Sequence, residues 1–378
     1  MSSLTGTTNA PAGNLGRLRS LDPMLLFVTL ALSVFGIVAV YVAGVDDRQG
    51  YAANQAIGFV VGLAGAIPLA LIDYRFWLRH LKVIYIAVIV MLLAVTVIGA
   101  AAGGAQRWIE IGPVQIQPSE FAKLMMVVVL AGYFADRAIG ETGPFMKSLG
   151  VLAIPGLLVF VQPDLGTSLV FGAVFVTMAF IGGAKIWQLA AIAGGVVASA
   201  FAAIRFGILE EYQVARLTAF INPENSGDVG YQVVQSKMAI GSGGLMGKGL
   251  EARTLATGGY LPEDHTDFIF ANLAERIGFA GSILLIVLFF LLIWRILHIA
   301  TISRDRFGVL IAVGVATIFL FHVFVNIGMT MGIMPVTGIP LPFVSYGRSS
   351  LVVSVISLGL LQSVAMRSRS DMSKSPRP

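Results

Sequence analysis

The densest group of ionisable residues in this chain lies just before its longest apolar segment. Four of the five residues at positions 263–267 are ionisable, and the apolar segment begins at Phe268. A carboxylate that is partly desolvated at such a boundary has a raised pKa, which suits it to act as a general base. Helix capping by Thr266 or Asp267 would explain one of these residues but not the whole group. Unless nearby cations oppose the rise in pKa, the pattern favours a reactive site in which a carboxylate of this group, the last of which is Asp267, could act as a base.

A second pair of ionisable residues begins another apolar segment. Glu120 and Lys123 follow Pro118, and a proline with a carboxylate in the first turn is typical of a helix start. Residues three apart share a helix face, so we expect an ion pair between Glu120 and Lys123. The pair can be structural, with each charge offsetting the burial of the other, or functional, because ionisable residues within a span commonly mark functional sites.

Three further segments combine glycine or proline with polar residues. Residues 162–168 form a very short connection in which Asp164 could cap the next helix. The glycine-rich run 241–249 contains Lys248 but lacks the spacing of a Walker loop, so it indicates tight turns rather than a phosphate cradle. Residues 334–350 contain three prolines, which excludes a regular helix. We expect this last segment to be re-entrant and to line a cavity.

The elements that must position these residues are apolar helices. The chain is 57% hydrophobic and 12% charged over 378 residues, whereas soluble domains contain about 25% charged residues. It has no cysteine and four histidines, so disulfides and thiolate metal sites are excluded and a zinc cluster is not expected. The composition predicts an all-α integral membrane protein with about ten transmembrane helices, each long enough to cross roughly 30 Å of hydrocarbon. The predicted spans are residues 24–45, 52–72, 81–101, 118–134, 149–161, 165–181, 186–203, 268–300, 308–329 and 349–366.

Lysine and arginine are distributed unequally over the connections between these spans. Short loops rich in positive charge stay in the cytoplasm, and the loops of the opposite set contain only Arg48, Arg107 and Arg348. We therefore expect both termini to be cytoplasmic. The long connection at about residues 205–266, between the seventh and eighth helices, is then extracytoplasmic. This topology accounts for the net charge of +5 without a nucleic-acid partner.

Five motifs together resemble the SEDS family (shape, elongation, division and sporulation) of bacterial cell-wall polymerases. The resemblance covers nearly the whole chain after roughly the first twenty residues, and residues 235–244 and 338–344 are more similar to the elongation branch than to the division branch. Chance matching of all five motifs in order is negligible. The motifs are Arg107-Trp108 with residues 117–120, residues 162–166, residues 230–232, residues 265–268, and residues 340–342 before residues 345–347.

The resemblance implies a peptidoglycan glycosyltransferase that polymerises lipid II, the undecaprenyl-pyrophosphate-linked disaccharide pentapeptide, on the outer face of the bacterial cytoplasmic membrane. It implies that Asp267 deprotonates the acceptor hydroxyl, which attacks the donor anomeric carbon with inversion and loss of undecaprenyl pyrophosphate. A pyrophosphate leaving group needs cations. A divalent cation, magnesium or manganese, could share that duty, although no ligand set in the sequence identifies one. The candidates for binding pyrophosphate or sugar are Arg107, Lys123, Lys237, Lys248, His265, Arg276 and Ser345.

The resemblance also implies a domain plan and partners. Residues 1–21 and 368–378 are expected to be cytoplasmic tails, the first of them disordered, on either side of a polymerase domain at residues 22–367. The expected partners are a class B penicillin-binding protein, which is a transpeptidase, and other membrane proteins of the elongation machinery. No nucleic-acid partner is expected.

Two other functions stay open, and one residue departs from the family pattern. A lipid II flippase would also use a polar cavity and kinked segments, but no inverted repeat is apparent and the charges gather at one side rather than at the midplane. A scaffold that docks a partner enzyme does not exclude catalysis. Where the family has a second glycine after Gly347, this chain has Arg348, which removes backbone freedom and adds a charge near the predicted cavity.

Overall fold

Apolar helices make up nearly all of the regular structure in this computed structural model. The structure describes residues 20–43, 48–102, 105–111, 114–207, 211–223, 226–252, 254–255, 258, 260–261 and 263–372. Most of the two predicted tails lies outside these residues, but the described part of the second tail continues the last helix to Met372.

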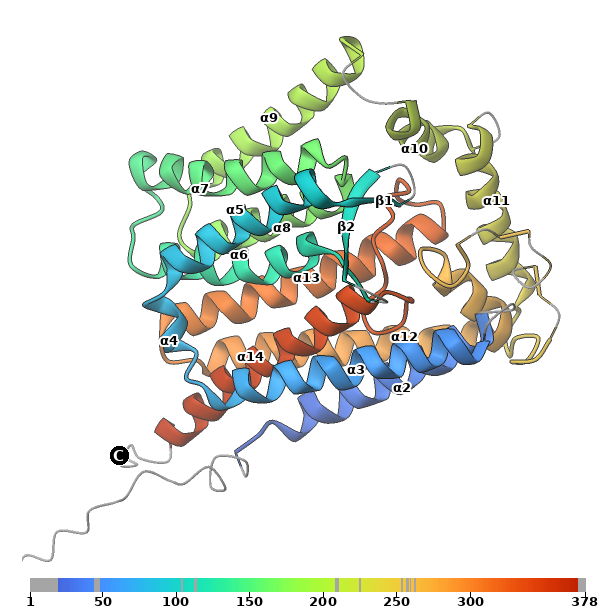
Figure 1. Ribbon diagram of the computed structural model, residues 1–378, viewed down its shortest axis with the longest axis horizontal. Helices are drawn as coiled ribbons and strands as arrows, with labels where there is room; N and C mark the ends of the chain where they lie inside the picture. The colour runs from blue at the N-terminus through green and yellow to red at the C-terminus, as the bar shows by residue number, and fades with distance from the viewer. Residues whose placement is uncertain are drawn as a thin grey trace, which may run out of the picture.

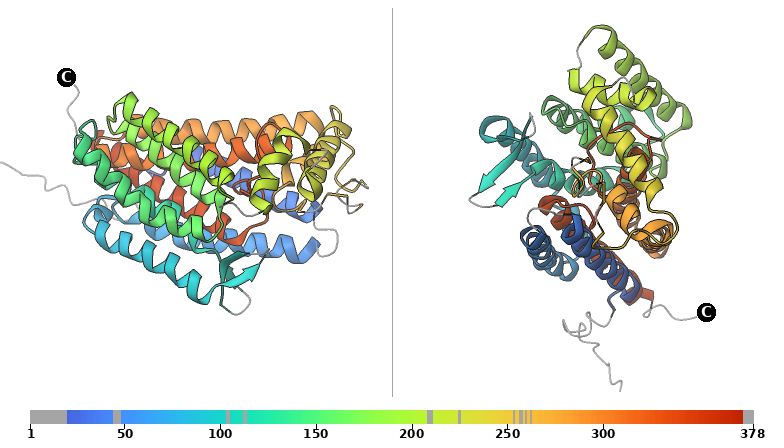
Figure 2. Two further views of the ribbon diagram at one scale, coloured as in Figure 1. Left: turned by 90° about the horizontal axis from the view of Figure 1, so that it is seen from above. Right: turned by 90° about the vertical axis from the view of Figure 1, so that its right-hand side faces the viewer.

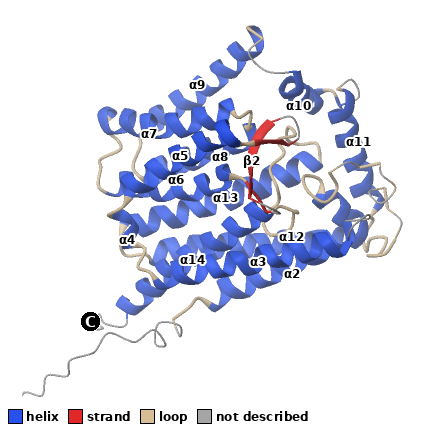
Figure 3. Cartoon of the chain, in the orientation of Figure 1, coloured by secondary structure: helices blue, strands red, loops and turns tan. Residues whose placement is uncertain are grey.

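The helices and strands follow one another as Figures 1 and 3 show. The helices are α2 (Pro23–Ala43), α3 (Arg48–Leu71), α4 (Arg75–Leu78), α5 (Leu81–Ile98), α6 (Pro118–Ala135), α7 (Thr142–Val161), α8 (Leu165–Ile181), α9 (Ile186–Arg205), α10 (Glu211–Ile221), α11 (Gly227–Ser242), α12 (Ile269–Ile302), α13 (Arg306–Thr330) and α14 (Arg348–Met372). The strands are β1 (Ala100–Ala102), β2 (Ala105–Ile111) and β3 (Val114–Ile116).

Each predicted span coincides with an apolar helix. Among the described residues, eight helices are long and apolar enough to cross a membrane, while α5 and α8 are apolar but shorter. The all-α membrane fold is therefore confirmed. Four boundaries differ from the prediction by three residues or more. Helix α3 begins at Arg48 rather than Ala52, α5 ends at Ile98 rather than Ala101, α7 begins at Thr142 rather than Leu149, and α14 ends at Met372 rather than Met366. The long connection at residues 205–266 contains two helices of its own, α10 and α11.

A small antiparallel sheet follows α5 and was not predicted. Strand β2 pairs with β1 through Trp108 opposite Ala100, and with β3 through Ile109 opposite Ile116. Ile109-Glu110-Ile111 alternates apolar and polar residues, and this two-residue period is the local signal of a strand. The sheet replaces the last turn of the predicted third span and positions Arg107 and Trp108 on a strand rather than in a loop.

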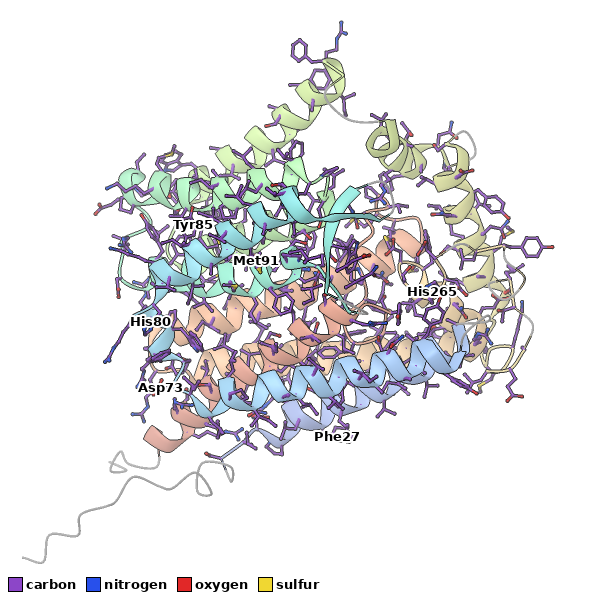
Figure 4. The ribbon with its side chains drawn as sticks, viewed as in Figure 1. Phe27, Asp73, His80, Tyr85, Met91 and His265 are labelled. Atoms are coloured by element: carbon purple, nitrogen blue, oxygen red, sulfur yellow. The ribbon has the colours of Figure 1, made fainter. Side chains whose placement is uncertain are left out.

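The helices pack side by side into an elongated bundle (Figure 2). Helix α14 packs against α3, and α12 packs against α2 and α13, whereas α9 extends away from the bundle in Figure 1. Asp22 accepts hydrogen bonds from Arg295 and Arg369, so the start of α2 lies beside the ends of α12 and α14. Figure 4 shows Asp73 and His80 at one end of the bundle and His265 at the other.

Helix α12 contains a break that the sequence did not reveal. Gly278 has a φ of 65°, a left-handed conformation that favours glycine. The glycine-rich loop fills the break, since the amide of Phe279 donates to the carbonyl of Gly244 (2.9 Å) and the amide of Lys248 donates to the carbonyl of Glu275 (3.0 Å). Backbone groups freed from the helix are therefore paired. This run forms turns, as expected, and its backbone is used to hold α12.

Candidate functional site

A cavity of about 490 Å³ lies at the His265 end of the bundle. Its walls come from α3, β2, β3, α6, α8, α10, α13, the start of α14, the connection before α12 and the segment between α13 and α14. Five of the predicted site residues line it, namely Arg107, Glu120, Lys123, His265 and Asp267. The fold thus brings together groups that are separated by up to 160 positions in the sequence.

Asp267 is partly buried, and a side chain of α13 holds its backbone. The amide side chain of Asn326, which is fully buried in α13, donates to the carbonyl of Asp267 and to that of Ile339, both at 2.9 Å. Gly338 has a φ of 73°, and a Cβ at that position would lie 3.3 Å from Oδ2 of Asp267 and 3.4 Å from Nη1 of Arg216. Glycine therefore lets the segment approach the carboxylate closely.

Burial raises the pKa of Asp267 to about 6. The positive charge of Arg216 opposes this rise, the neighbouring carboxylate of Glu263 adds to it, and His265 and Arg107 oppose it further. A carboxyl with this pKa is ionised at neutral pH and still binds a proton readily, which are the two requirements of a general base.

Among the described residues that line the cavity, four are lysine or arginine: Arg107, Lys123, Arg216 and Arg348. The guanidinium of Arg107 donates to the carbonyls of Gln162 (3.2 Å) and Pro163. That of Arg216 donates to the carbonyl of Thr337 (3.0 Å). These bonds to neutral carbonyls orient the two side chains without neutralising their charge.

A chain of hydrogen bonds extends from Lys123 into the bundle. Lys123 Nζ lies 2.7 Å from Oε1 of Glu120, so the predicted ion pair forms, and both side chains are buried. The same Nζ lies 3.0 Å from Nε2 of His322, whose Nδ1 lies 3.0 Å from the carbonyl of Pro340. Because a carbonyl only accepts, Nδ1 of His322 carries the proton and Nε2 accepts from the Lys123 ammonium. The chain connects α6, α13 and the segment that contains Pro340.

Two other predicted polar residues support the walls. Asp164 caps α8 as expected, since its side chain accepts from the amide of Thr167 (3.0 Å), and it also accepts from the hydroxyl of Ser119 (3.2 Å) in α6. Ser345 is buried beside the cavity rather than in its lining, and its hydroxyl donates to the carbonyl of Thr266 (2.7 Å). Ser345 therefore holds the irregular segment against the connection that carries Asp267.

Three predicted substrate-binding cations lie outside this cavity. Lys248 Nζ is 2.7 Å from the buried carboxylate of Glu275, and buried Arg276 donates from Nε to Asn272 Oδ1 (2.7 Å). Lys237 is exposed on α11, away from the cavity lining. The cavity therefore gives no support to their assignment to the substrate, which stays a prediction. Lys248 and Arg276 hold the glycine-rich loop to the break in α12.

Sequence reasoning missed two ionisable residues of the site. Arg216 lies on α10, in the middle of the long connection, and nothing in its neighbourhood in the sequence distinguishes it. His322 lies inside the apolar helix α13, where an ionisable residue is itself a signal of function.

The cavity does not identify a metal ligand set. Within the part of the chain that the structure describes, no group of three or more His, Cys, Asp or Glu side chains is arranged to hold a metal ion. Three acidic residues of the lining serve other roles, since Glu120 pairs with Lys123, Asp164 caps α8, and Glu263 accepts from the hydroxyl of Thr266 (2.7 Å). We therefore derive no step through a divalent cation.

The fold and site define a class of protein: an integral membrane protein with a polar cavity, containing one carboxylate of raised pKa and several cations, at one end of its helix bundle. The sequence profile of the family of FtsW, RodA and SpoVE, described as cell cycle protein, matches residues 23–370. The chain belongs to this family, the SEDS family that its motifs resemble.

Named relatives span nearly the whole chain. Peptidoglycan glycosyltransferase MrdB of Escherichia coli is 39% identical over 349 residues, which are 91% of this chain and 93% of the relative. Stage V sporulation protein E of Bacillus subtilis is 35% identical over 361 residues, covering 92% and 98%. The rod shape determining protein RodA of Thermus thermophilus has a similar structure, with a TM-score of 0.70 at 28% identity, covering 91% of this chain and 96% of that one.

A similar chain has also been solved within a peptidoglycan synthase complex that coordinates polymerization and crosslinking. It aligns with a TM-score of 0.79 at 28% identity and covers 92% of this chain and 98% of that one. The fold described above is thus shared over nearly the full length of both chains.

Proposed function

We propose that this chain, a peptidoglycan glycosyltransferase of the RodA type that acts in cell elongation, polymerises lipid II with Asp267 as the general base. The observation that carries the proposal is a partly buried carboxylate with a pKa of about 6 in a cavity that four basic side chains also line. The similarity to MrdB supports the activity, and the similarity to RodA supports the role in elongation.

The reaction joins an acceptor hydroxyl to the anomeric carbon of a donor sugar. Ionised Asp267 accepts the hydroxyl proton while the hydroxyl oxygen attacks, and the bond between the anomeric carbon and the pyrophosphate oxygen breaks with inversion. Negative charge then develops on the leaving pyrophosphate. Arg107, Arg216 and Arg348 line the same cavity and are the residues we assign to stabilise it. Asp267 afterwards releases its proton to water.

The Glu120–Lys123 pair gives Lys123 a different role in this scheme. Its ammonium is shared between a carboxylate and His322 Nε2, so most of its hydrogen-bonding capacity is used within the protein. We assign Lys123 to holding the cavity wall through His322 and Pro340, with its charge adding to the field at the leaving group. We assign His265 to the acceptor side of the cavity. Ser345 is assigned to support the connection that carries Asp267.

The membrane orientation is part of the proposal. The excess of lysine and arginine in one set of loops supports a cytoplasmic location for that end of the bundle. The cavity then opens at the extracytoplasmic end of a multi-pass protein of the bacterial cytoplasmic membrane, with both termini cytoplasmic. A lipid-linked substrate would reach it from the outer leaflet.

A transpeptidase partner is supported by the similarity to a chain of a peptidoglycan synthase complex that coordinates polymerization and crosslinking. We propose a class B penicillin-binding protein, with other membrane proteins of the elongation machinery joining the same assembly. Crosslinking would then follow polymerisation on the same side of the membrane.

The proposed function is tested with purified protein and lipid II, with and without the transpeptidase. Asp267→Asn is compared with Asp136→Asn, a matched change at an exposed position outside the cavity. We expect Asp267→Asn to lose on the order of 10²–10⁴ in polymerisation rate, the usual contribution of a general base, and Asp136→Asn to keep the wild-type rate. Glycan synthesis by Asp267→Asn at the wild-type rate would exclude the assignment. Movement of lipid II between leaflets of a proteoliposome without polymerisation would favour a flippase.

A further inference from the structure

Three aromatic rings from three separate elements meet on one wall of the cavity. Tyr51 comes from the first turns of α3, His265 from the connection before α12, and Tyr346 from the segment before α14. The Tyr51 and His265 rings stack with centroids 5.0 Å apart, and the Tyr51 and Tyr346 rings meet edge to face at 4.9 Å. The His265 and Tyr346 centroids are 5.9 Å apart. We call these three residues the aromatic wall.

A chain of hydrogen bonds from α12 holds the aromatic wall in place. Nδ1 of His265 lies 3.2 Å from Oδ1 of Asp264, whose Oδ2 accepts from Nδ2 of Asn272 at 2.9 Å. Asn272 in turn accepts from Nε of Arg276 at 2.7 Å. Asn272 and Arg276 are buried in α12, so a rigid element fixes the imidazole through this chain of hydrogen bonds. The amide of Tyr346 also donates to the carbonyl of His265 (2.9 Å). Rings fixed before a ligand arrives lose little conformational freedom when it binds.

The position of the aromatic wall relates it to one of the two sugars. His265 is two residues from Asp267, and both side chains line the cavity. The hydroxyl that Asp267 deprotonates must come within hydrogen-bond reach of the carboxylate, so the acceptor sugar lies on this side. The donor must place its pyrophosphate near cations. Arg107 and Arg216 come from β2 and α10, which contribute no ring to the aromatic wall, whereas Arg348 lies at the start of α14, two residues after Tyr346.

The chemistry of the two tyrosine rings matches a sugar ring better than a phosphate. A pyranose has one face of axial C–H groups, which packs on the face of an aromatic ring and withdraws apolar surface from water, while its hydroxyls stay at the edge. Tyrosine rings have no charge with which to bind a pyrophosphate. Ligand sites commonly combine such apolar surfaces with a few polar groups that fix orientation, and here Asp267 is the adjoining polar group.

We propose that the aromatic wall is the acceptor subsite, on which the hexopyranose that supplies the attacking hydroxyl packs its C–H face against Tyr51 and Tyr346. This inference rests on the proposed glycosyl transfer and adds which of its two sugars lies on this side of the cavity. The wall acts through packing, so the ring is required at positions 51 and 346 and the phenolic hydroxyl is secondary.

The test separates the acceptor from the donor. One substrate is a lipid-linked disaccharide whose attacking hydroxyl is capped by an extra sugar, so it can only donate. The other has its cleavable pyrophosphate replaced by a phosphonate, so it can only accept. A single coupling reaction between the two is followed while each concentration is varied in turn. Tyr51→Leu and Tyr346→Leu remove a ring, and Tyr51→Phe keeps one as the matched control.

We expect each leucine variant to raise the half-saturating concentration of the acceptor roughly tenfold, the scale of a lost aromatic contact, and to change that of the donor less than about twofold. Tyr51→Phe should match the wild type. A rise for the donor instead, or no rise for either, overturns the inference even where Asp267→Asn is inactive. Activity of Asp267→Asn would overturn the proposed function instead, and the two failures are thus distinct.

A binding measurement covers the case in which a leucine variant does not fold. Tyr51→Trp keeps an aromatic ring in the wall and adds a fluorophore to the four tryptophans of the chain. We expect the acceptor-only compound to change the additional fluorescence relative to wild type and the donor-only compound to leave it unchanged. A response to the donor alone contradicts the inference.

Discussion

Replacing Asp267 with asparagine should make the protein more stable while it removes activity. The pKa of a free aspartate is 3.8, and in this cavity burial raises it to about 6. A carboxyl shifted in this way is less stable in its ionised form, by roughly 3 kcal/mol, in the folded than in the unfolded protein. An asparagine of the same shape has no charge to desolvate, so it removes this cost at neutral pH.

The gain in stability from Asp267→Asn should depend on pH in a definite direction. The folded pKa lies above the unfolded one, so the proton on Asp267 contributes stability that is fully present below about pH 3.8 and lost as the pH rises through about 6. The difference between Asp267→Asn and wild type should thus be largest above pH 7 and shrink toward pH 4. Because the side chain is only partly buried, we expect Asp267→Asn to raise the free energy of unfolding by about 1–3 kcal/mol rather than by the full cost of the ionised carboxylate.

The assay is thermal unfolding of the detergent-solubilised protein at pH 7.5, 6.0 and 5.0. For a chain of this size the gain corresponds to a rise of a few degrees in Tm at pH 7.5. Asp136→Asn, at an exposed position outside the cavity, should leave Tm unchanged at all three values. A lower Tm for Asp267→Asn at pH 7.5, or a gain that does not shrink with falling pH, would show that the ionised Asp267 carboxylate does not destabilise the folded protein.

Three further changes give separate predictions. Glu120→Gln removes one partner of a buried ion pair and should lower the free energy of unfolding by about 3–5 kcal/mol. The double change Glu120→Leu with Lys123→Met should lower it less than that single change. Chemical unfolding measures both. Gly338→Ala places a Cβ 3.3 Å from Oδ2 of Asp267 at a φ of 73°. It should therefore lower the free energy of unfolding by about 1–2 kcal/mol, and it should lower kcat more than it raises KM. Arg348→Gly should leave Tm within about 2 °C of wild type and change the polymerisation rate by a modest factor, and loss of folded protein would show that the arginine is structurally required.

Long apolar segments were predictable because each must by itself span the hydrocarbon. The positions of the ten apolar helices therefore followed from sequence, as did the irregular segment around Pro340 and the boundary position of Asp267. The sheet at residues 100–116 was missed because its strands are as short as three residues and follow directly on an apolar run. The break at Gly278 was missed because only the glycine-rich loop, distant in the sequence, pairs the freed backbone groups.

The partners of the charged side chains were the hardest feature to predict. Arg276 follows a polar residue just as Arg107 does, and Lys248 lies between two glycines, yet the fold directs Lys248 to Glu275 and Arg276 to Asn272. Only long-range packing distinguishes a cation that lines a cavity from one that holds a loop. His322 could have been found, since a histidine inside an apolar helix is unusual, whereas nothing near Arg216 in the sequence indicates that it lies beside Asp267.

The central claim, that Asp267 is the base, is tested most directly by the pH dependence of kcat/KM for lipid II polymerisation, which reports the ionisation of the free enzyme. We expect a plateau above pH 7 and a fall of about tenfold per pH unit below about pH 6, where Asp267 becomes protonated. His265→Gln should retain this fall, although at a lower rate. A value of kcat/KM that stays constant from pH 7.5 to pH 5 would exclude Asp267 as the base.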